Sequence, residues 1–208
     1  MRRNVSAAGF TLIELTVVLA VIVTLALILT PSIANFINDS RIARARSDCN
    51  TIGTAVTQFY KDVGFFPQWR AANKGGQGQN QDRVDLLVSG GNIPTEQTPS
   101  QWTTGSTSPL SDQLLTNAPG FTWRTHTSQF GWNGPYLSSD IGSDPWNNRY
   151  MVNVGLIDTS VGPTGVSGAP KPVVWVISAG PNGTIETTYM QLMTGAQLSG
   201  DDIGIRIQ

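Results

Sequence analysis

The sequence predicts an α+β protein in which one long N-terminal helix packs on a small antiparallel β-sheet. Two observations lead to this expectation. A continuous apolar run from Phe10 to Thr30 is followed by apolar residues at helical spacing from Ile42 to Val63, and the short runs with strand character all come after residue 149. A leading helix followed by strands and turn-rich segments is typical of α+β arrangements. The 208 residues suffice for one core of ordinary domain size beyond the apolar segment.

The first half of the predicted helix has the composition of a membrane span. Between Phe10 and Thr30 the only charged side chain is that of Glu14. About 20 apolar residues are enough to cross the hydrocarbon of a bilayer as a helix. Arg2 and Arg3 precede the segment, and basic residues favour the cytoplasmic side. We therefore expect a single-pass membrane protein whose N-terminus is cytoplasmic and whose remainder is exported.

Small residues near the N-terminus predict a short leader rather than removal of the whole apolar run. Ala7, Ala8 and Gly9 precede that run, whereas a secretory leader places its small residues after it. Cleavage after Gly9 would leave the helix as a new N-terminus that begins at Phe10. The expected divisions are a leader at 1–9, a transmembrane and assembly helix at 10–34, and its amphipathic continuation at 35–64.

An apolar stripe continues beyond Pro31, a residue that we expect to kink or loosen the helix without ending it. Members of the stripe recur every three or four positions: Ile42, Ala45, Cys49, Ile52, Val56, Phe59 and Val63. Side chains at this spacing share one helical face and require a sheet to cover them. Gly64 is the expected end of the helix.

Turn-forming and polar residues dominate after Gly64. Residues 65–131 are therefore expected to be an extended loop region, and residues 132–208 a β-sheet region. The glycine-rich stretch 73–81 predicts a flexible loop, and 84–88 and 110–115 predict short helical turns. The expected strands are 150–154, 173–178 and, at an edge, 203–207.

Charge and residue counts argue against two classes of function. The net charge is −1, without a basic patch beyond the leader and one short arginine run, which disfavours nucleic acid as the main partner. The single cysteine, Cys49, excludes an intrachain disulfide. The only histidine, His126, has no evident carboxylate near it in sequence, so we expect no enzyme. A membrane-anchored exoenzyme is the remote alternative.

Glu14 admits two interpretations. In the first, its carboxylate lies near the membrane interface and reaches the headgroups. In the second, cleavage after Gly9 creates an amine on Phe10, and the Glu14 carboxylate of another copy neutralises that amine when the apolar helices pack side by side. A charge in the bilayer costs about 2.5 kcal/mol or more, so such residues are usually paired or functional.

Two sets of motifs resemble a known family. GFTLIELTVVLAVIVTLALILTP, from Gly9 to Pro31, is similar to the class III signal peptide and N-terminal helix of type IV pilins and type II secretion pseudopilins. FYKDVGFFP, GPYL, DPWNNRY, ISAGPNG and GDDIG follow in the order of matching motifs in major pseudopilins. Together the two sets of matches cover the N-terminal 67 residues and most of 132–204, while about 68–131 lies outside the resemblance.

The resemblance implies a type IV pilin-like fold and a structural subunit of a helical pseudopilus. It implies that a prepilin peptidase cleaves after Gly9 and methylates Phe10, and that Glu14 and Pro31 serve assembly. The implied partners are further copies of the chain, minor pseudopilins, an inner-membrane assembly platform and its ATPase. The chain would lie in the bacterial inner membrane before assembly, and in a periplasmic or extracellular filament that drives export of folded exoproteins afterwards. A type IV pilin whose long fibre serves adhesion, motility or DNA uptake is the nearer alternative.

Major pseudopilins bind calcium in their C-terminal loop, so the resemblance also implies a Ca²⁺ site. Asp202 is the first candidate ligand and Asp201 the second, because Ca²⁺ favours hard oxygens from a loop that wraps it. Asn182 falls where the family has an aspartate, and it would offer a neutral oxygen instead. The segment 184–199 is also longer than in the family. A solvated pair of acids is the alternative to a metal site.

Four aromatic residues accompany the turn motifs: Trp132, Tyr136, Trp146 and Tyr150. We expect their large apolar bodies to cap the core of a small sheet. An aromatic platform for sugars is the alternative interpretation.

Overall fold

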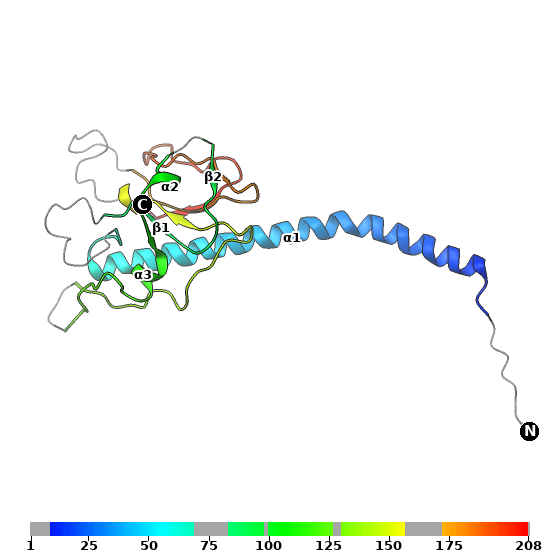
Figure 1. Cartoon of the computed structure of the whole chain (residues 1–208), viewed down its shortest axis with the longest axis horizontal. Coiled ribbons are helices and arrows are strands. Elements are labelled where there is room, and N and C mark those ends of the chain that lie inside the picture. Colours follow the sequence, from blue (N-terminus) through cyan, green and yellow to red (C-terminus); the bar gives the residue numbers. More distant parts are fainter. Residues whose placement is uncertain (1–8, 69–82, 98–99, 127–129, 157–171, 208) are drawn as a thin grey trace, which may run out of the picture. The chain divides into compact units, whose positions relative to one another are not determined.

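The computed structural model of the chain describes residues 9–68, 83–97, 100–126, 130–156 and 172–207. Most of the expected leader and the glycine-rich stretch 73–81 lie outside these ranges. The chain divides into two compact units, Met1–Arg41 and Ile42–Gln208. The helix α1 (Leu12–Val63, 52 residues) is shared between them: its residues up to Arg41 belong to the first unit and those from Ile42 to the second (Figure 1).

In the first unit, every described residue is exposed. The exposed fractions of Phe10, Leu27 and Phe36 are 85%, 71% and 74%. Pro31 lies inside α1, which continues on both sides of it, so the prediction that this proline does not end the helix is confirmed. By length and composition α1 can cross a membrane once, a property that a membrane span and a signal anchor share.

In the second unit, α1 buries the predicted apolar stripe. Six members are buried and Ile42 packs at the margin: Ala45, Cys49, Ile52, Val56, Phe59 and Val63. The helix ends at Val63, and Gly64 follows in a left-handed conformation with φ of 89°. The Gly64 N–H donates to the Tyr60 carbonyl at 2.9 Å. The predicted stripe and helix end are therefore confirmed.

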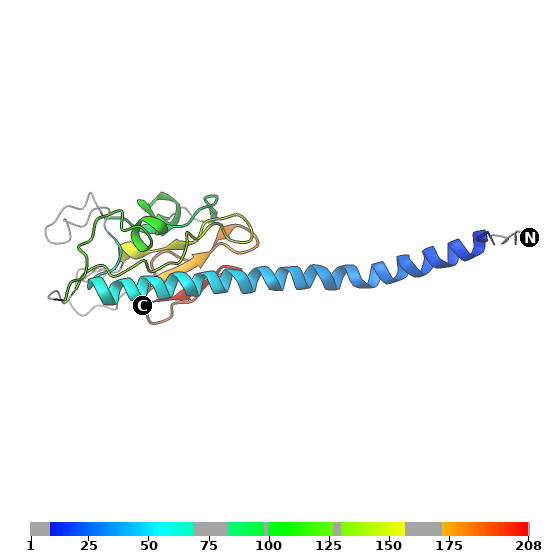
Figure 2. The same cartoon turned by 90° about the horizontal axis from the view of Figure 1, so that it is seen from below.

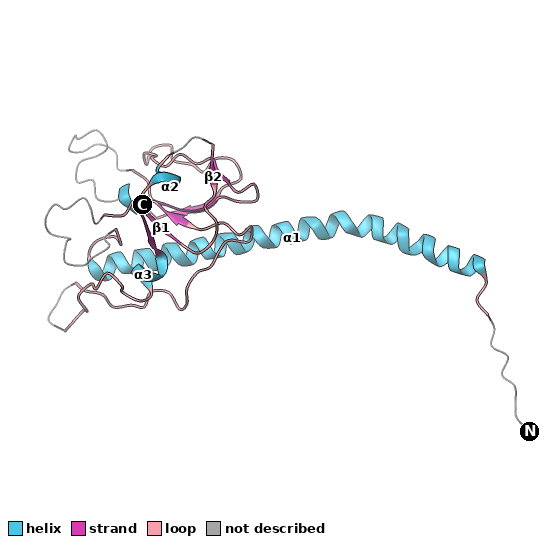
Figure 3. Ribbon diagram, viewed as in Figure 1, coloured by secondary structure: helices cyan, strands magenta, loops and turns pink. Residues whose placement is uncertain are grey.

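A five-stranded sheet packs against this part of α1 (Figure 3). Its strand order is β3-β1-β4-β5-β7. Its strands are β1 (Leu86–Val88), β3 (Thr107–Pro109), β4 (Met151–Val152), β5 (Trp175–Ser178) and β7 (Ile203–Arg206). The pair β1 and β3 is parallel, and the other neighbours are antiparallel. The expected α+β arrangement is confirmed, with a mixed sheet in place of a purely antiparallel one.

Shorter elements surround the sheet. They are a second, parallel pair of β2 (Thr95–Glu96) with β6 (Thr184–Ile185), the helices α2 (Gln101–Thr104) and α3 (Leu110–Leu114), and the 3₁₀ turn η3 (Val154–Leu156). The helical turn expected at 110–115 is confirmed by α3. The turn expected at 84–88 is wrong, because β1 occupies this run and pairs with strands on both sides. Residues 65–131 thus supply two strands of the main sheet.

Both faces of the sheet are covered, so there are two clusters of buried side chains. Val174 and Val176 belong to the cluster that contains the α1 stripe. Trp175 and Ile177 belong to a second cluster, with Trp102 of α2. This alternation explains why the run VVWVI, from Val173 to Ile177, is apolar throughout. Figure 2 shows the C-terminal half of α1 alongside the strands.

Close packing of α1 on β7 fixes where the C-terminal segment lies. A side chain at Gly53 would collide with the Ile205 side chain, so glycine permits the helix and the strand to approach. Asp202 immediately precedes β7. The position of this carboxylate is therefore set by a strand that is packed against the helix.

Candidate functional site

The predicted processing site lies directly ahead of α1. Gly9 and Phe10 precede the first helical residue, Leu12, and both are exposed. A Cβ atom placed at Gly9 would have no described atom within 4 Å. The peptide bond that joins Gly9 to Phe10 therefore lies between two exposed residues.

Glu14 and Thr11 bind each other at the start of α1. The Thr11 N–H and hydroxyl donate to Glu14 Oε2 at 2.9 and 2.8 Å, and the Glu14 N–H donates to Thr11 Oγ1 at 3.3 Å. This reciprocal pattern is a capping box, which satisfies two backbone donors at a helix start. The sequence signal, Thr-x-x-Glu, was present and was missed. Glu14 thus has a local role in addition to the two predicted from sequence.

Threonine hydroxyls in the apolar half of α1 bond to their own helix. Each donates to a carbonyl three or four residues earlier, at 2.7 to 2.9 Å: Thr16 to Ile13, Thr24 to Val21 and Thr30 to Ala26. Such bonds satisfy the hydroxyl without an outside partner. This segment therefore exposes an apolar surface whose polar side chains are already paired.

Three carboxylates gather where the segment after β6 meets the segment before β7. Asp202 Oδ2 accepts the N–H groups of Glu186 and Thr187 at 3.0 and 2.7 Å. Asp201 Oδ2 accepts the Asn182 N–H at 3.0 Å, and Asn182 Nδ2 donates to Glu186 Oε1 at 2.6 Å. The structure thus brings together the three residues predicted from sequence, and it adds Glu186.

Each of these carboxylates retains one buried oxygen without a hydrogen-bond partner: Glu186 Oε2, Asp201 Oδ1 and Asp202 Oδ1. No ion pair joins them to a lysine or arginine in the described ranges. Burial raises the pKa of Asp202 to about 6, against hydrogen bonds from Thr187 and Glu186 that lower it. Buried carboxylate oxygens without a donor or cation are unfavourable.

The chemistry of these donors fits a hard cation, since Ca²⁺ is held by carboxylate and carbonyl oxygens. Their arrangement is incomplete, because within the described ranges no group of three or more His, Cys, Asp or Glu side chains is already placed to hold a metal ion. A cation would therefore have to draw the free oxygens of Glu186, Asp201 and Asp202 together.

Gly200 lies against the carboxylate of Glu186. It adopts a left-handed conformation with φ of 62°, and a Cβ atom there would lie 2.5 Å from Glu186 Oε2. Only glycine is compatible with both features. Glu186 was not among the residues predicted from sequence, although it is the only acidic residue between positions 184 and 199 and follows Asn182 by four.

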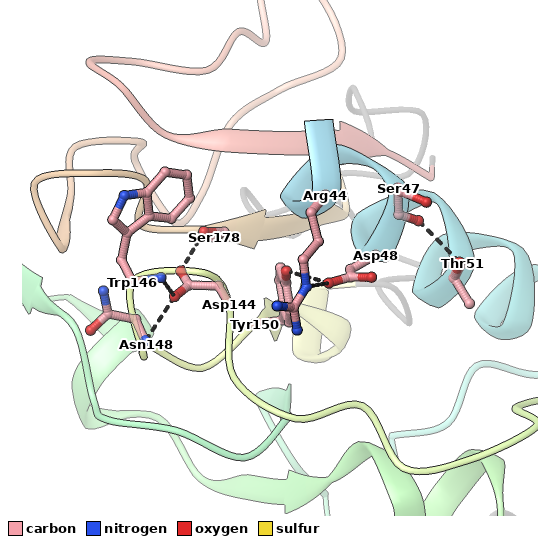
Figure 4. A network of polar contacts seen from close by, with 9 residues as sticks. All are labelled: Arg44, Ser47, Asp48, Thr51, Asp144, Trp146, Asn148, Tyr150 and Ser178. Atoms are coloured by element: carbon pink, nitrogen blue, oxygen red, sulfur yellow. Dashed lines mark hydrogen bonds and ion pairs between the residues drawn. The ribbon is translucent and has the colours of Figure 1, made fainter. Parts of the chain in front are cut away.

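The motif DPWNNRY forms a turn around the buried carboxylate of Asp144 (Figure 4). Asp144 Oδ1 accepts the N–H groups of Trp146 and Asn148 at 3.0 and 2.8 Å. Its Oδ2 accepts the Ser178 hydroxyl at 2.6 Å. The carboxylate therefore closes its own turn and ties it to the end of β5.

The last residue of the motif connects to α1. The Tyr150 hydroxyl donates to Asp48 Oδ2 at 2.8 Å, and Arg44 Nε lies 3.6 Å from the same oxygen (Figure 4). Tyr150 and Trp132 are 0% and 2% exposed. Both rings belong to the core, as expected, and are not available as a sugar platform.

His126 and Cys49, the two residues considered for catalysis, have different surroundings in the structure. His126 is exposed. Cys49 is buried, and its thiol donates to the Ile203 carbonyl at 3.7 Å. Burial and the charge of nearby Asp48 raise the pKa of this thiol to about 12, which is far from the depressed values of nucleophilic cysteines.

The chain matches no protein-family model, and no curated protein or solved structure shows similarity to it. Its long apolar N-terminal helix and small mixed sheet are compatible with a pilin-like fold. The resemblance to pseudopilins therefore depends on the sequence motifs together with this arrangement.

Proposed function

We propose that this chain is a structural subunit of a helical filament assembled from the membrane, namely the major pseudopilin of a type II protein secretion system. The observation that carries the proposal is the first half of α1, whose apolar side chains are all exposed. An apolar surface of this extent requires a partner or lipid to cover it. Lipid would serve before assembly, and the same helices of other copies would serve afterwards.

Cleavage after Gly9 would produce the assembling form. It removes Arg2 and Arg3, so the net side-chain charge changes from −1 to −3. Lateral packing would then depend on apolar contact between helices rather than on opposite charges. An assembly ATPase would add subunits from the membrane, and the growing stalk would push exoproteins through an outer-membrane channel.

Glu14 would change partners during this process. In the single chain its carboxylate accepts both donors of Thr11. In the filament it would also neutralise the Phe10 amine of a neighbouring copy, since an ionised group in apolar surroundings is stabilised by an opposite charge. This pairing would set the axial position of one subunit against the next.

The leader is tested by replacing Gly9 with leucine. We expect Gly9→Leu to accumulate as an uncut precursor in the membrane fraction, because the peptidase can no longer accommodate the residue before the scissile bond. Mass spectrometry of the N-terminus measures cleavage and any added methyl group. Normal processing of this variant would contradict the leader assignment.

The pairing role of Glu14 is separated from its capping role by three variants. Glu14→Gln keeps an oxygen for Thr11 but loses the charge, Thr11→Val loses the hydroxyl of the capping box, and Glu14→Ala loses both functions. We expect all three to be cleaved, and Glu14→Gln and Glu14→Ala to give few filaments. Wild-type filament yield from Glu14→Gln would show that the carboxylate serves only as a cap.

Imaging of sheared cells distinguishes secretion from a surface fibre. We expect deletion of the gene to abolish release of exoproteins, with no long fibres of this chain on wild-type cells. Long extracellular fibres together with normal secretion in the deletion strain would identify the chain as a type IV pilin instead.

A further inference from the structure

We propose that Asn133 is a site of spontaneous covalent modification, at which the side-chain amide is lost and an aspartyl or isoaspartyl residue is left. The chain has two Asn-Gly pairs, Asn133–Gly134 and Asn182–Gly183. Such pairs favour the reaction, because glycine has no side chain to shield the backbone nitrogen that attacks the amide. The fold holds the second pair in hydrogen bonds and leaves the first free to react. This modification is independent of filament formation.

The side chain of Asn133 is exposed and unrestrained. Its backbone N–H donates to the Tyr136 hydroxyl at 2.9 Å, and no other hydrogen bond engages this residue in the part of the chain that the structure describes. The N–H of Gly134, which carries the attacking nitrogen, likewise has no acceptor among the described residues. Both groups that must combine are therefore free of hydrogen bonds that would have to break first.

Asn182 provides the internal comparison, since its side chain is exposed as well. Its Oδ1 accepts the Thr184 N–H at 2.6 Å, and its Nδ2 donates to Glu186 Oε1 at 2.6 Å. The Gly183 N–H donates to the Gly180 carbonyl at 3.3 Å. The amide and the attacking nitrogen of this pair are thus both held. Hydrogen bonding, and not exposure, distinguishes the two pairs.

Packing requires glycine at position 134. A Cβ atom there would lie 2.6 Å from Trp132 Cζ2 and 2.9 Å from Tyr136 Cδ2. Trp132 belongs to the cluster of buried side chains around α1, and Tyr136 packs against that cluster. A side chain at position 134 is therefore excluded, so an asparagine at position 133 is always followed by the residue that makes it most reactive.

The reaction consumes only water. The backbone nitrogen of Gly134 loses its proton to solvent and attacks Cγ of Asn133. As the new N–Cγ bond closes a succinimide ring, the Cγ–Nδ2 bond breaks and Nδ2 leaves as ammonia with a proton from solvent. Water then adds to one ring carbonyl and breaks its bond to the ring nitrogen. Opening at Cγ gives aspartate, and opening at the backbone carbonyl gives isoaspartate, whose main chain runs through Cβ and Cγ.

The isoaspartyl product would disturb a segment that is anchored on both sides. The Trp132 N–H donates to the Thr122 carbonyl at 2.7 Å, and the Tyr136 N–H donates to the Leu114 carbonyl at 2.8 Å. Isoaspartate adds one atom to the main chain between these anchors, so Gly134 must move from its place against the two rings. The aspartyl product adds a charge and leaves the length of the main chain unchanged.

Ageing of the full chain in detergent at neutral pH tests the inference, with mass spectrometry of its proteolytic peptides as the measurement. We expect Asn133 to convert on the order of tenfold faster than Asn182, because a hydrogen-bonded site reacts only from locally opened states. In denaturant the two pairs should convert at similar rates, since neither is then held. Equal rates in the folded protein, or faster conversion of Asn182, would overturn the inference.

An isoaspartyl methyltransferase provides a second measurement, because it transfers a methyl group to isoaspartyl residues. Asn133→Gln should remove most of the methyl incorporation after ageing, since attack on the longer side chain must close a larger and less favourable ring. Asn182→Gln is the matched control and should leave the incorporation nearly unchanged. Incorporation that persists in Asn133→Gln would place the modified residue elsewhere and overturn the assignment.

Asn133→Asp separates the added charge from the lengthened main chain. We expect this variant, measured fresh, to melt close to the temperature of fresh wild type. Aged wild type that is rich in isoaspartate should melt at a lower temperature, because its anchored segment is longer. An aged sample that melts as the fresh protein does would contradict the expected displacement of Gly134.

Discussion

The two halves of α1 have the same backbone structure and different surroundings. Before Arg41 every described residue is exposed, and apolar side chains occur around the whole circumference. After Ile42 the apolar side chains form one stripe, and the sheet covers it. A helix that is apolar all round belongs in an apolar medium, and one with a single apolar face belongs against a core. The distribution of apolar residues around the helix, more than their number, therefore indicates where each half resides.

Phenylalanine occurs in both halves and offers a matched pair of substitutions. Phe59 is fully buried with its ring edge-on to Phe121 and Tyr136, whereas Phe36 is 74% exposed. We expect Phe59→Ala to lower the free energy of unfolding by about 3–5 kcal/mol, because a buried aromatic ring leaves a cavity. Phe36→Ala should change it by less than about 0.5 kcal/mol. Denaturant unfolding in detergent measures both, and similar losses would refute the contrast.

Arginine substitutions should affect the first half of α1 more than the second, because only the first half is expected to lie in the membrane. We expect Leu25→Arg to reduce stable membrane insertion, since arginine at the centre of a spanning helix costs about 2.5–3.5 kcal/mol. Thr54→Arg, at an exposed position of the second half, is the control and should insert normally. Alkaline extraction of membranes measures the retained fraction. Full retention of Leu25→Arg would indicate that this half does not lie in lipid.

The reactivity of the Cys49 thiol tests whether the second half of α1 stays packed against the sheet, and this is the smallest of the expected effects. Burial and the raised pKa of Cys49, about 12, leave almost no thiolate at pH 8. An exposed thiol at position 47, in a Ser47→Cys and Cys49→Ala double variant, should have a pKa near 8.5 and react on the order of 1,000-fold faster with iodoacetamide. Mass spectrometry follows the labelling. Fast labelling of native Cys49 would mean that the helix separates readily from β7.

Local patterns were sufficient for much of the fold. The stripe from Ile42 to Val63 and the strand that includes Trp175 carry strong periodic or compositional signals. The run at 84–88 carries neither, and it became β1 only by pairing with β3 and β4 far along the chain. The strand β3 was not predicted, because its last residue, Pro109, argues against a strand in the interior of a sheet. Proline is tolerated at a sheet edge, which is where β3 lies.

The candidate site was predicted less completely. Asp201, Asp202 and Asn182 carried motif signals, and the structure brings them together. Glu186 lies in a segment without any motif, and the folding of two loops places it beside them. Thr11 illustrates the opposite situation, because its capping signal is local and was readable. The position of Glu186 depends on two loops that meet only in the folded chain, so it could not be derived from the spacing of residues in the sequence.

Between Leu15 and Pro31, each threonine hydroxyl of α1 is bonded to its own helix. Surfaces of this kind offer neighbours methyl groups and no directional contact, so two such helices in contact could slide lengthwise at little energetic penalty. An array joined through them would be extensible under tension: it would lengthen by gliding, without breaking any hydrogen bond along this segment. Resistance to stretching would then arise at its two ends, from Glu14 and from the folded unit that follows Arg41.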